Sequence, residues 1–128
     1  MAAPSRLLVT TTVLVAATTA HAQTVLRVRA NAPAGGNGAS WATAYNDLQA
    51  AINVSRSVAS ATPVQIWVAG GTYLPTQLNP PTDPRSASFR EFRNNTTILG
   101  GFAGQDATPT LRNLQAHPTI LSGDIGAT

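Results

Sequence analysis

Two of the five acidic residues in this chain occupy comparable positions, and a pair of carboxylates is the most reactive feature of the sequence. Asp106 and Asp124 each follow a short apolar segment that runs into glycine. If those segments lie side by side, both carboxylates share one edge and could contribute to a calcium site. Calcium prefers about six to eight oxygen ligands, so two aspartates are a weak candidate, and capping of local turns is the simpler interpretation.

The other acids show no catalytic arrangement. A glycosidase uses paired carboxylates, and a polysaccharide lyase of the calcium-dependent kind combines aspartates with a base. Asp47 falls in a predicted helix, Asp83 in a proline-rich loop, and Glu91 between two arginines. None recurs at a regular spacing, so the sequence predicts no catalytic residue and no cofactor beyond the weak calcium candidate.

Other reactive side chains are scarce. The absence of cysteine excludes thiolate zinc sites and cysteine nucleophiles. His117 is the single histidine after residue 22, which excludes a metal motif with two histidines. The glycine-rich segment 31–39 is read as a turn, because a phosphate-binding loop would need a lysine and the chain has none.

The basic residues do not indicate a nucleic-acid interface. All eight are arginines, and they are scattered along the chain. Removal of Arg6 with an export signal would lower the formal net charge from +3 to +2. A nucleic-acid footprint needs a concentrated basic stripe, so we expect no nucleic-acid partner.

Residues 1–22 have the pattern of a Sec-type signal peptide. One early arginine precedes an apolar, threonine-rich stretch, and small residues at 20 and 22 end the segment. The apolar stretch is too short for a convincing membrane span. We expect cleavage after Ala22 and one exported domain, residues 23–128, with no transmembrane span.

Hydrophobic periodicity places short strands and one helix in that domain. Alternating apolar residues predict strands at 24–30, 64–68, 96–99 and 119–121. Apolar residues at intervals of three and four predict a helix from Ser40 to Ser57, with Trp41, Leu48 and Ile52 as core anchors. Ser40 or Thr43 could cap its N-terminus.

A repeat predicts how the strands assemble. The sequence TTILGGF at 96–102 returns as PTILSGD at 118–124, a period of 22 residues, and IWVAGGTY at 66–73 has the same shape. Recurring strands with long connections are typical of a solenoid. We therefore expect an all-β, right-handed parallel β-helix of three to four rungs, in which TTILGGF and PTILSGD are consecutive rungs. Its structural corners are five glycines: Gly70, Gly71, Gly100, Gly101 and Gly123.

The ends of that solenoid need covering. The helix containing Trp41 is expected to cap the first rung as an N-terminal capping helix. The segment 74–88 contains four prolines and is expected to be a long external loop. No element that could close the last rung follows residue 121, which suggests truncation at the C-terminal end.

The motifs GGNGASW, DLQAAI, IWVAGGTYLPT, TTILGGFAG and HPTILSGDIG, in this order, support a family resemblance. The chain resembles the N-terminal region of secreted bacterial parallel β-helix proteins with a pectate-lyase-like fold, and is similar to adhesin-like members that resemble polymorphic outer-membrane proteins. The resemblance spans about residues 25–126. It implies that Arg112, which precedes the last strand, bridges a loop to backbone carbonyls.

The resemblance leaves two functions open, because this fold carries both enzymes and non-catalytic surface proteins. The first is an exported non-catalytic module of a cell-surface or adhesin-like protein, with surface glycans or a host or cell-surface protein as partner. In that case the proline-rich loop is the contact surface. The second is the N-terminal part of a polysaccharide lyase or glycoside hydrolase whose active site lies in missing rungs.

Overall fold

The computed structural model describes residues 23–90 and 93–124. The predicted signal peptide with its cleavage site after Ala22, and the acidic Glu91, lie outside the described residues.

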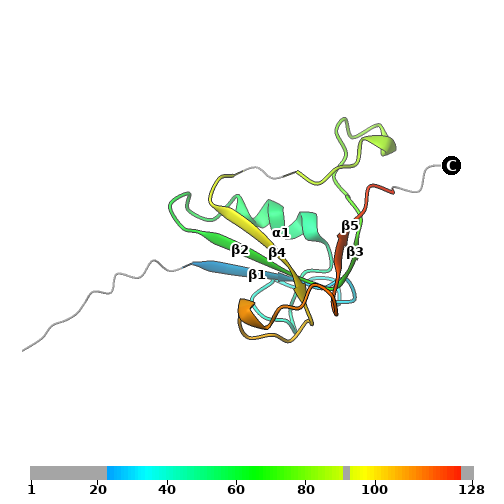
Figure 1. Ribbon diagram of the computed structural model, residues 1–128. Helices are drawn as coiled ribbons and strands as arrows, with labels where there is room; N and C mark the ends of the chain where they lie inside the picture. The colour runs from blue at the N-terminus through cyan, green and yellow to red at the C-terminus, as the bar shows by residue number, and fades with distance from the viewer. Residues whose placement is uncertain (1–22, 91–92, 125–128) are drawn as a thin grey trace, which may run out of the picture.

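The larger sheet has three parallel strands in the order β1-β2-β4. They are β1 (Thr24–Val28), β2 (Val64–Ala69) and β4 (Thr96–Phe102). Leu26, Ile66 and Ile98 stand in register across this sheet, whose three strands are labelled in Figure 1. A second sheet of two parallel strands, β3 (Gly71–Tyr73) and β5 (Thr119–Leu121), lies at one end of the first.

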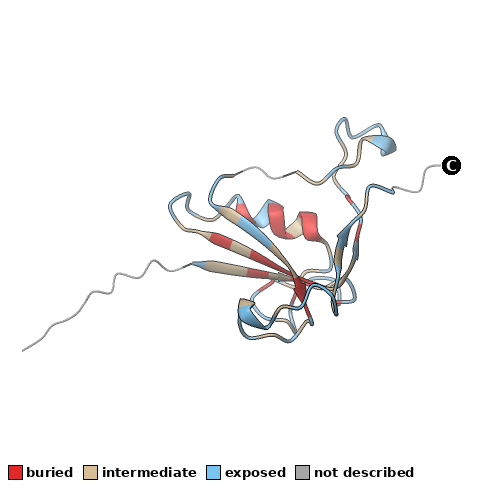
Figure 2. Ribbon diagram, viewed as in Figure 1, coloured by how far each residue is buried: buried red, intermediate tan, exposed pale blue. Residues whose placement is uncertain are grey.

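The helix α1 (Leu48–Ser55) connects β1 to β2 and packs on one face of the larger sheet. Its apolar stripe packs against buried side chains of the strands. Figure 2 shows buried positions on both the helix and the strands. Those core residues are Leu26, Val28, Leu48, Ala51, Ile52, Val64, Ile66, Val68 and Tyr73. Two short 3₁₀ turns, η1 (Pro84–Ser86) and η2 (Pro109–Leu111), lie in the long loops.

The predicted right-handed parallel β-helix is wrong. Over residues 23–90 and 93–124 the chain forms two small parallel sheets and one α-helix, with no solenoid. In a solenoid every turn would add a strand to each sheet and sheets would enclose the core. Here α1 covers the core, and the described parts of the long loops (74–90, 93–95 and 103–118) contribute no further strand to either sheet.

The two most similar repeats do not stack on each other. Ile98 in β4 pairs with Ile66 of β2, whereas Ile120 in β5 pairs with Thr72 of β3. The prediction that TTILGGF and PTILSGD are consecutive rungs is therefore wrong. Thr119 explains the register, because its hydroxyl accepts from the Gly101 N–H (2.9 Å) and lies 3.2 Å from the Ala69 carbonyl. These bonds hold β5 against the C-terminal ends of β2 and β4.

The helix is shorter than predicted and does not cap an end of a coil. It begins at Leu48, with Asp47 as its N-cap, and not at Ser40. The backbone of Tyr45 bonds to β1 on both sides, to the Arg27 carbonyl (2.9 Å) and from the Arg29 N–H (2.8 Å). A residue that extends a parallel ladder cannot also be helical. The pairing of Tyr45 therefore keeps the segment before Leu48 out of the helix, although its apolar spacing is helical.

A second apolar cluster fills the sheet face opposite α1. Phe102 is fully buried between two indoles: Trp67 stacks on it with ring centroids 4.9 Å apart, and Trp41 lies 5.6 Å away at a tilted angle. The guanidinium of Arg27 covers the outer face of Trp67 at 5.0 Å from the ring centroid. This arrangement gives Trp41 a packing role in the loop before α1.

Tyr73 joins the end of β1 to the corner after β2. Its buried hydroxyl donates to the Ala69 carbonyl (2.8 Å) and accepts from the Ala30 N–H (3.1 Å). Burial raises the pKa of the Tyr73 phenol above its ordinary 10.0, although the Ala30 hydrogen bond and the positive charge of Arg29 act in the opposite direction. The folded state therefore favours the neutral phenol.

Replacing Tyr73 with phenylalanine should lower the free energy of unfolding by about 1–2 kcal/mol at pH 7, because two backbone groups lose their partner. In the wild type, the unfolded chain releases the phenol proton near pH 10.0, while the folded chain keeps it to higher pH. Stability from this group is thus complete below pH 10.0 and falls as the pH rises above it.

Urea unfolding of both proteins at pH 7, 9, 10 and 11 checks this. The difference between them should shrink above pH 10.0, because only the wild type carries the Tyr73 phenol. A constant difference across the series would contradict the buried neutral phenol.

Candidate functional site

The structure gives Asp106 a role inside its own turn. Its side-chain Oδ2 accepts from the Ala103 N–H (2.8 Å), and its backbone carbonyl accepts from the Trp41 indole N–H (2.8 Å). Asp106 therefore ties the turn after β4 to the loop before α1. The bond from the Ala103 N–H to the Asp106 carboxylate caps a local turn, which is the simpler of the two interpretations of Asp106 given by the sequence.

Asp124 lies in a different setting, in a pocket beside the proline-rich loop. The described residues contain no group of three or more histidine, cysteine, aspartate or glutamate side chains that could hold a metal ion. The calcium site suggested for Asp106 and Asp124 thus has no observed set of ligands, and it stays a prediction from sequence.

The other residues singled out in the sequence lie in the framework. Leu48 and Ile52 are buried in the core on α1, and Arg112 ends η2 with its backbone N–H bonded to the Pro109 carbonyl (3.2 Å). Gly71 (φ +147°) and Gly101 (φ +87°) have backbone angles that favour glycine. At Gly70 and Gly100 the chain approaches closely, so a Cβ atom would lie 3.0 Å from His117 and 2.8 Å from Thr119 respectively. Around Gly123 there is open space.

The proline-rich loop is an ordered structure, held internally by polar contacts. The Ser88 N–H donates to the Gln77 carbonyl (3.1 Å), which closes the base of the loop. The Ser86 hydroxyl accepts from the Asn79 N–H (2.7 Å), and Asp83 caps η1 by accepting from the Arg85 N–H (2.9 Å). These contacts hold the loop in one shape.

The start of α1 anchors both ends of this loop. At the entry, the Thr76 hydroxyl donates to the Asp47 carboxylate (2.9 Å). At the exit, the side-chain amide of Gln49 accepts from the Arg90 N–H (2.8 Å) and donates to the Arg90 carbonyl (3.0 Å). Because Gln49 is only 1% exposed, these bonds are shielded from water.

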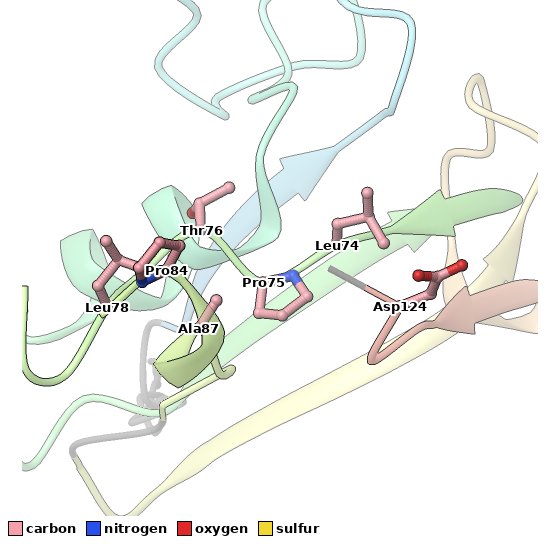
Figure 3. Close-up of a pocket in the computed structure, with 7 residues that line it drawn as sticks. All are labelled: Leu74, Pro75, Thr76, Leu78, Pro84, Ala87 and Asp124. Carbon is pink, nitrogen blue, oxygen red and sulfur yellow. The ribbon is translucent and has the colours of Figure 1, made fainter. Parts of the chain in front are cut away.

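The anchored loop forms one wall of a pocket of about 460 Å³. Leu78, Pro84 and Ala87 come from the loop, Asp124 comes from the segment after β5, and the chain 74–76 runs between them (Figure 3). The described lining is mostly apolar, and among these described residues Asp124 is the charged one. Such a surface can bind an apolar group and pair one positive charge.

Sequence reasoning identified the loop but not the pocket. Four prolines predicted an external segment, and prolines line the site at 75 and 84. Leu78 and Ala87 carried no signal of their own, because their place in the same pocket as Asp124 depends on the packing of β5 beside β3. Asp124 was singled out for calcium, whereas the structure places it next to apolar groups.

Comparison of the chain with models of protein families, with curated proteins and with solved structures found no match. Within residues 23–90 and 93–124, no helix is long and apolar enough to cross a membrane.

Proposed function

We propose that the chain is an exported, non-catalytic recognition module that binds a cell-surface protein through the pocket beside its proline-rich loop. The observation that carries the proposal is the pocket itself: an apolar lining, one carboxylate and an ordered loop anchored at both ends. An anchored loop loses little conformational freedom when a partner binds, which favours recognition. Export is supported by the signal-peptide pattern of residues 1–22.

The lining favours a protein partner over a glycan. Sugars present many hydroxyl groups and are best held by aromatic faces and several polar side chains. This pocket has leucine, proline and alanine walls, with Thr76 and Asp124 as its polar side chains. Both tryptophans lie elsewhere, next to Phe102. An apolar side chain next to a basic one fits better.

The same lining supports binding without turnover. Hydrolysis or elimination at a sugar needs at least a second acid or base close to the first. In the pocket, Asp124 is accompanied by a hydroxyl and by apolar groups. One carboxylate can orient a cation, which is what a recognition site requires.

A binding screen tests the proposal. The chain is purified from the exported fraction of a bacterial culture, where its N-terminus should be Gln23, and is applied to an array of capped random hexapeptides and an array of polyuronates and neutral glycans. We expect retention on peptides that combine an arginine or lysine with a leucine or valine. Leu78→Ser should weaken that binding about fivefold or more, since it removes an apolar wall.

Leu111→Ser is the matched control, because Leu111 is 57% exposed and lies outside the pocket. It should bind the peptides like the wild type. Preferential retention on the glycan array, or release of unsaturated or reducing sugar ends from it, would contradict the proposal. An equal loss of peptide affinity in Leu78→Ser and Leu111→Ser would show that the peptides do not bind in this pocket.

A further inference from the structure

A second, smaller cavity adjoins the pocket. It has a volume of about 280 Å³ and is lined by Ala30, Asn46, Asp47, Thr72, Tyr73, Leu74 and Thr76. Leu74 and Thr76 line both cavities. The two cavities therefore adjoin along one short segment of chain, and a ligand that lies along this segment can contact both.

The shared segment has the alternation of an extended chain. Thr72, Leu74 and Thr76 are exposed, while Tyr73 and Pro75 between them are buried. Leu74 in particular is 48% exposed, a large apolar side chain at the centre of the two cavities. An extended ligand that lies across this row can place successive side chains into both cavities.

The smaller cavity also has one carboxylate, held in a fixed position. Asp47 Oδ1 accepts from the Gln49 N–H (3.1 Å), and Oδ2 accepts from the Thr76 hydroxyl (2.9 Å). An ionised carboxylate offers roughly four acceptor positions, so these two bonds orient Asp47 and leave capacity for a further donor. Its partial exposure leaves that donor a route from solvent.

Charge is the property that the two cavities share. Asp47 is the charged residue of the smaller cavity and Asp124 that of the larger, and none of the described lining residues is an arginine. The whole chain is basic, with a formal net charge of +3 that includes both of these aspartates. The groove is therefore acidic at both ends and apolar in the middle, on a protein of the opposite net charge.

From this arrangement we infer that the two cavities form one groove that binds an extended polypeptide segment of the partner, with a basic side chain on each side of an apolar one. This inference rests on the proposed function and specifies its ligand. Asp124 pairs with one basic group, Leu74 contacts the apolar side chain, and Asp47 pairs with the second basic group. Two charge contacts set the register of the bound segment.

Three capped peptides test the inference with the full chain by fluorescence anisotropy. One has two arginines flanking a leucine with one alanine between, and the other two each have one of the arginines replaced by alanine. The protein variants are Asp47→Asn and Asp124→Asn, singly and together. Asparagine is also a good N-cap, so Asp47→Asn preserves the start of α1.

We expect each single variant to weaken binding of the two-arginine peptide about threefold to fivefold, and the double variant by about the product. Each one-arginine peptide should bind the wild type more weakly than the two-arginine peptide, and the double variant should weaken it more than either single variant, because one arginine can pair with either carboxylate. Raising the salt concentration from 0.05 M to 0.5 M should reduce the difference between wild type and variants, because both pairs are near solvent. Asp106→Asn, which removes the same charge outside the groove, should bind like the wild type.

Other results overturn the inference. Asp47→Asn could leave binding unchanged while Asp124→Asn and Leu78→Ser weaken it. In that case only the larger pocket binds the peptide, so the inference of one groove is wrong and the proposed function is retained. If no peptide binds the wild type, both the groove inference and the proposed function are wrong. If sedimentation shows a dimer that Asp47→Asn dissociates, the groove is occupied by an arginine of a second copy.

Discussion

Replacing Phe102 with alanine should lower the free energy of unfolding by about 4 kcal/mol, the largest loss expected from a single substitution in this protein. The side chain is fully buried and lies between Trp67 and Trp41. Its removal eliminates two aromatic contacts and leaves a cavity that the flanking rings cannot fill without moving. Small domains have about 5–15 kcal/mol in total, so this single substitution should remove roughly a quarter to four fifths of the stability.

Two control variants, Phe102→Leu and Leu111→Ala, show whether the loss of stability is specific to the buried aromatic ring or follows from any loss of apolar volume. The leucine variant keeps part of the apolar volume and should lose about 1–2 kcal/mol. Leu111 is 57% exposed, so its replacement should change stability by less than about 0.5 kcal/mol. Urea unfolding followed by tryptophan fluorescence is suited to the comparison, because both tryptophans of the chain contact Phe102. Equal midpoints for Phe102→Ala and Leu111→Ala would contradict the second apolar cluster.

Replacing Gln49 with leucine should destabilise the fold by about 3 kcal/mol, although the side chain keeps a similar volume. The amide of Gln49 satisfies both backbone groups of Arg90 and also donates to Asn53 Oδ1 (2.9 Å). Leucine can do none of this, so the Arg90 N–H and carbonyl would lose their partners in a shielded position. The exit of the proline-rich loop would then detach from α1.

Asn53→Ala is the matched control, because it removes a single side-chain bond to the same amide at an exposed position. Its loss should not exceed about 1 kcal/mol. Hydrogen exchange adds a local readout: the Arg90 amide proton should exchange at least tenfold faster in Gln49→Leu than in Asn53→Ala. Protection of that proton in Gln49→Leu would contradict the anchoring role. Peptide binding should weaken together with the loss of protection, because the loop forms one wall of the pocket.

The positions of the strands were largely readable from the sequence. The runs at 64–68 and 119–121 alternate β-branched and apolar residues, and the structure has β2 at Val64–Ala69 and β5 at Thr119–Leu121. Parallel pairing was also anticipated and is observed in both sheets. Strand propensity and alternation act over a few residues, which is why they can be read locally.

The assembly of the strands could not be read in the same way. Similarity between 96–102 and 118–124 suggested that β4 and β5 are neighbours, yet they belong to different sheets. Similar strands can pair in several registers with similar local energy, so a repeat restricts the choice without deciding it. The helix shows the same limit. Apolar spacing extended back to Trp41, but the backbone bonds of Tyr45 to Arg27 and Arg29 keep the segment before Asp47 out of the helix, which begins at Leu48.

The candidate site divides along the same line. The sequence predicted an external proline-rich loop and an export signal, and it showed few catalytic groups. It also singled out Asp124, as a candidate calcium ligand. The tertiary structure decided that the loop is anchored by Asp47 and Gln49, and that Asp124 faces leucine and proline. Composition and local pattern determine which short segments form strands and turns, because those preferences depend on neighbouring residues. The groove brings together residues 30, 47, 76 and 124, and only the packing of the folded chain could place them side by side.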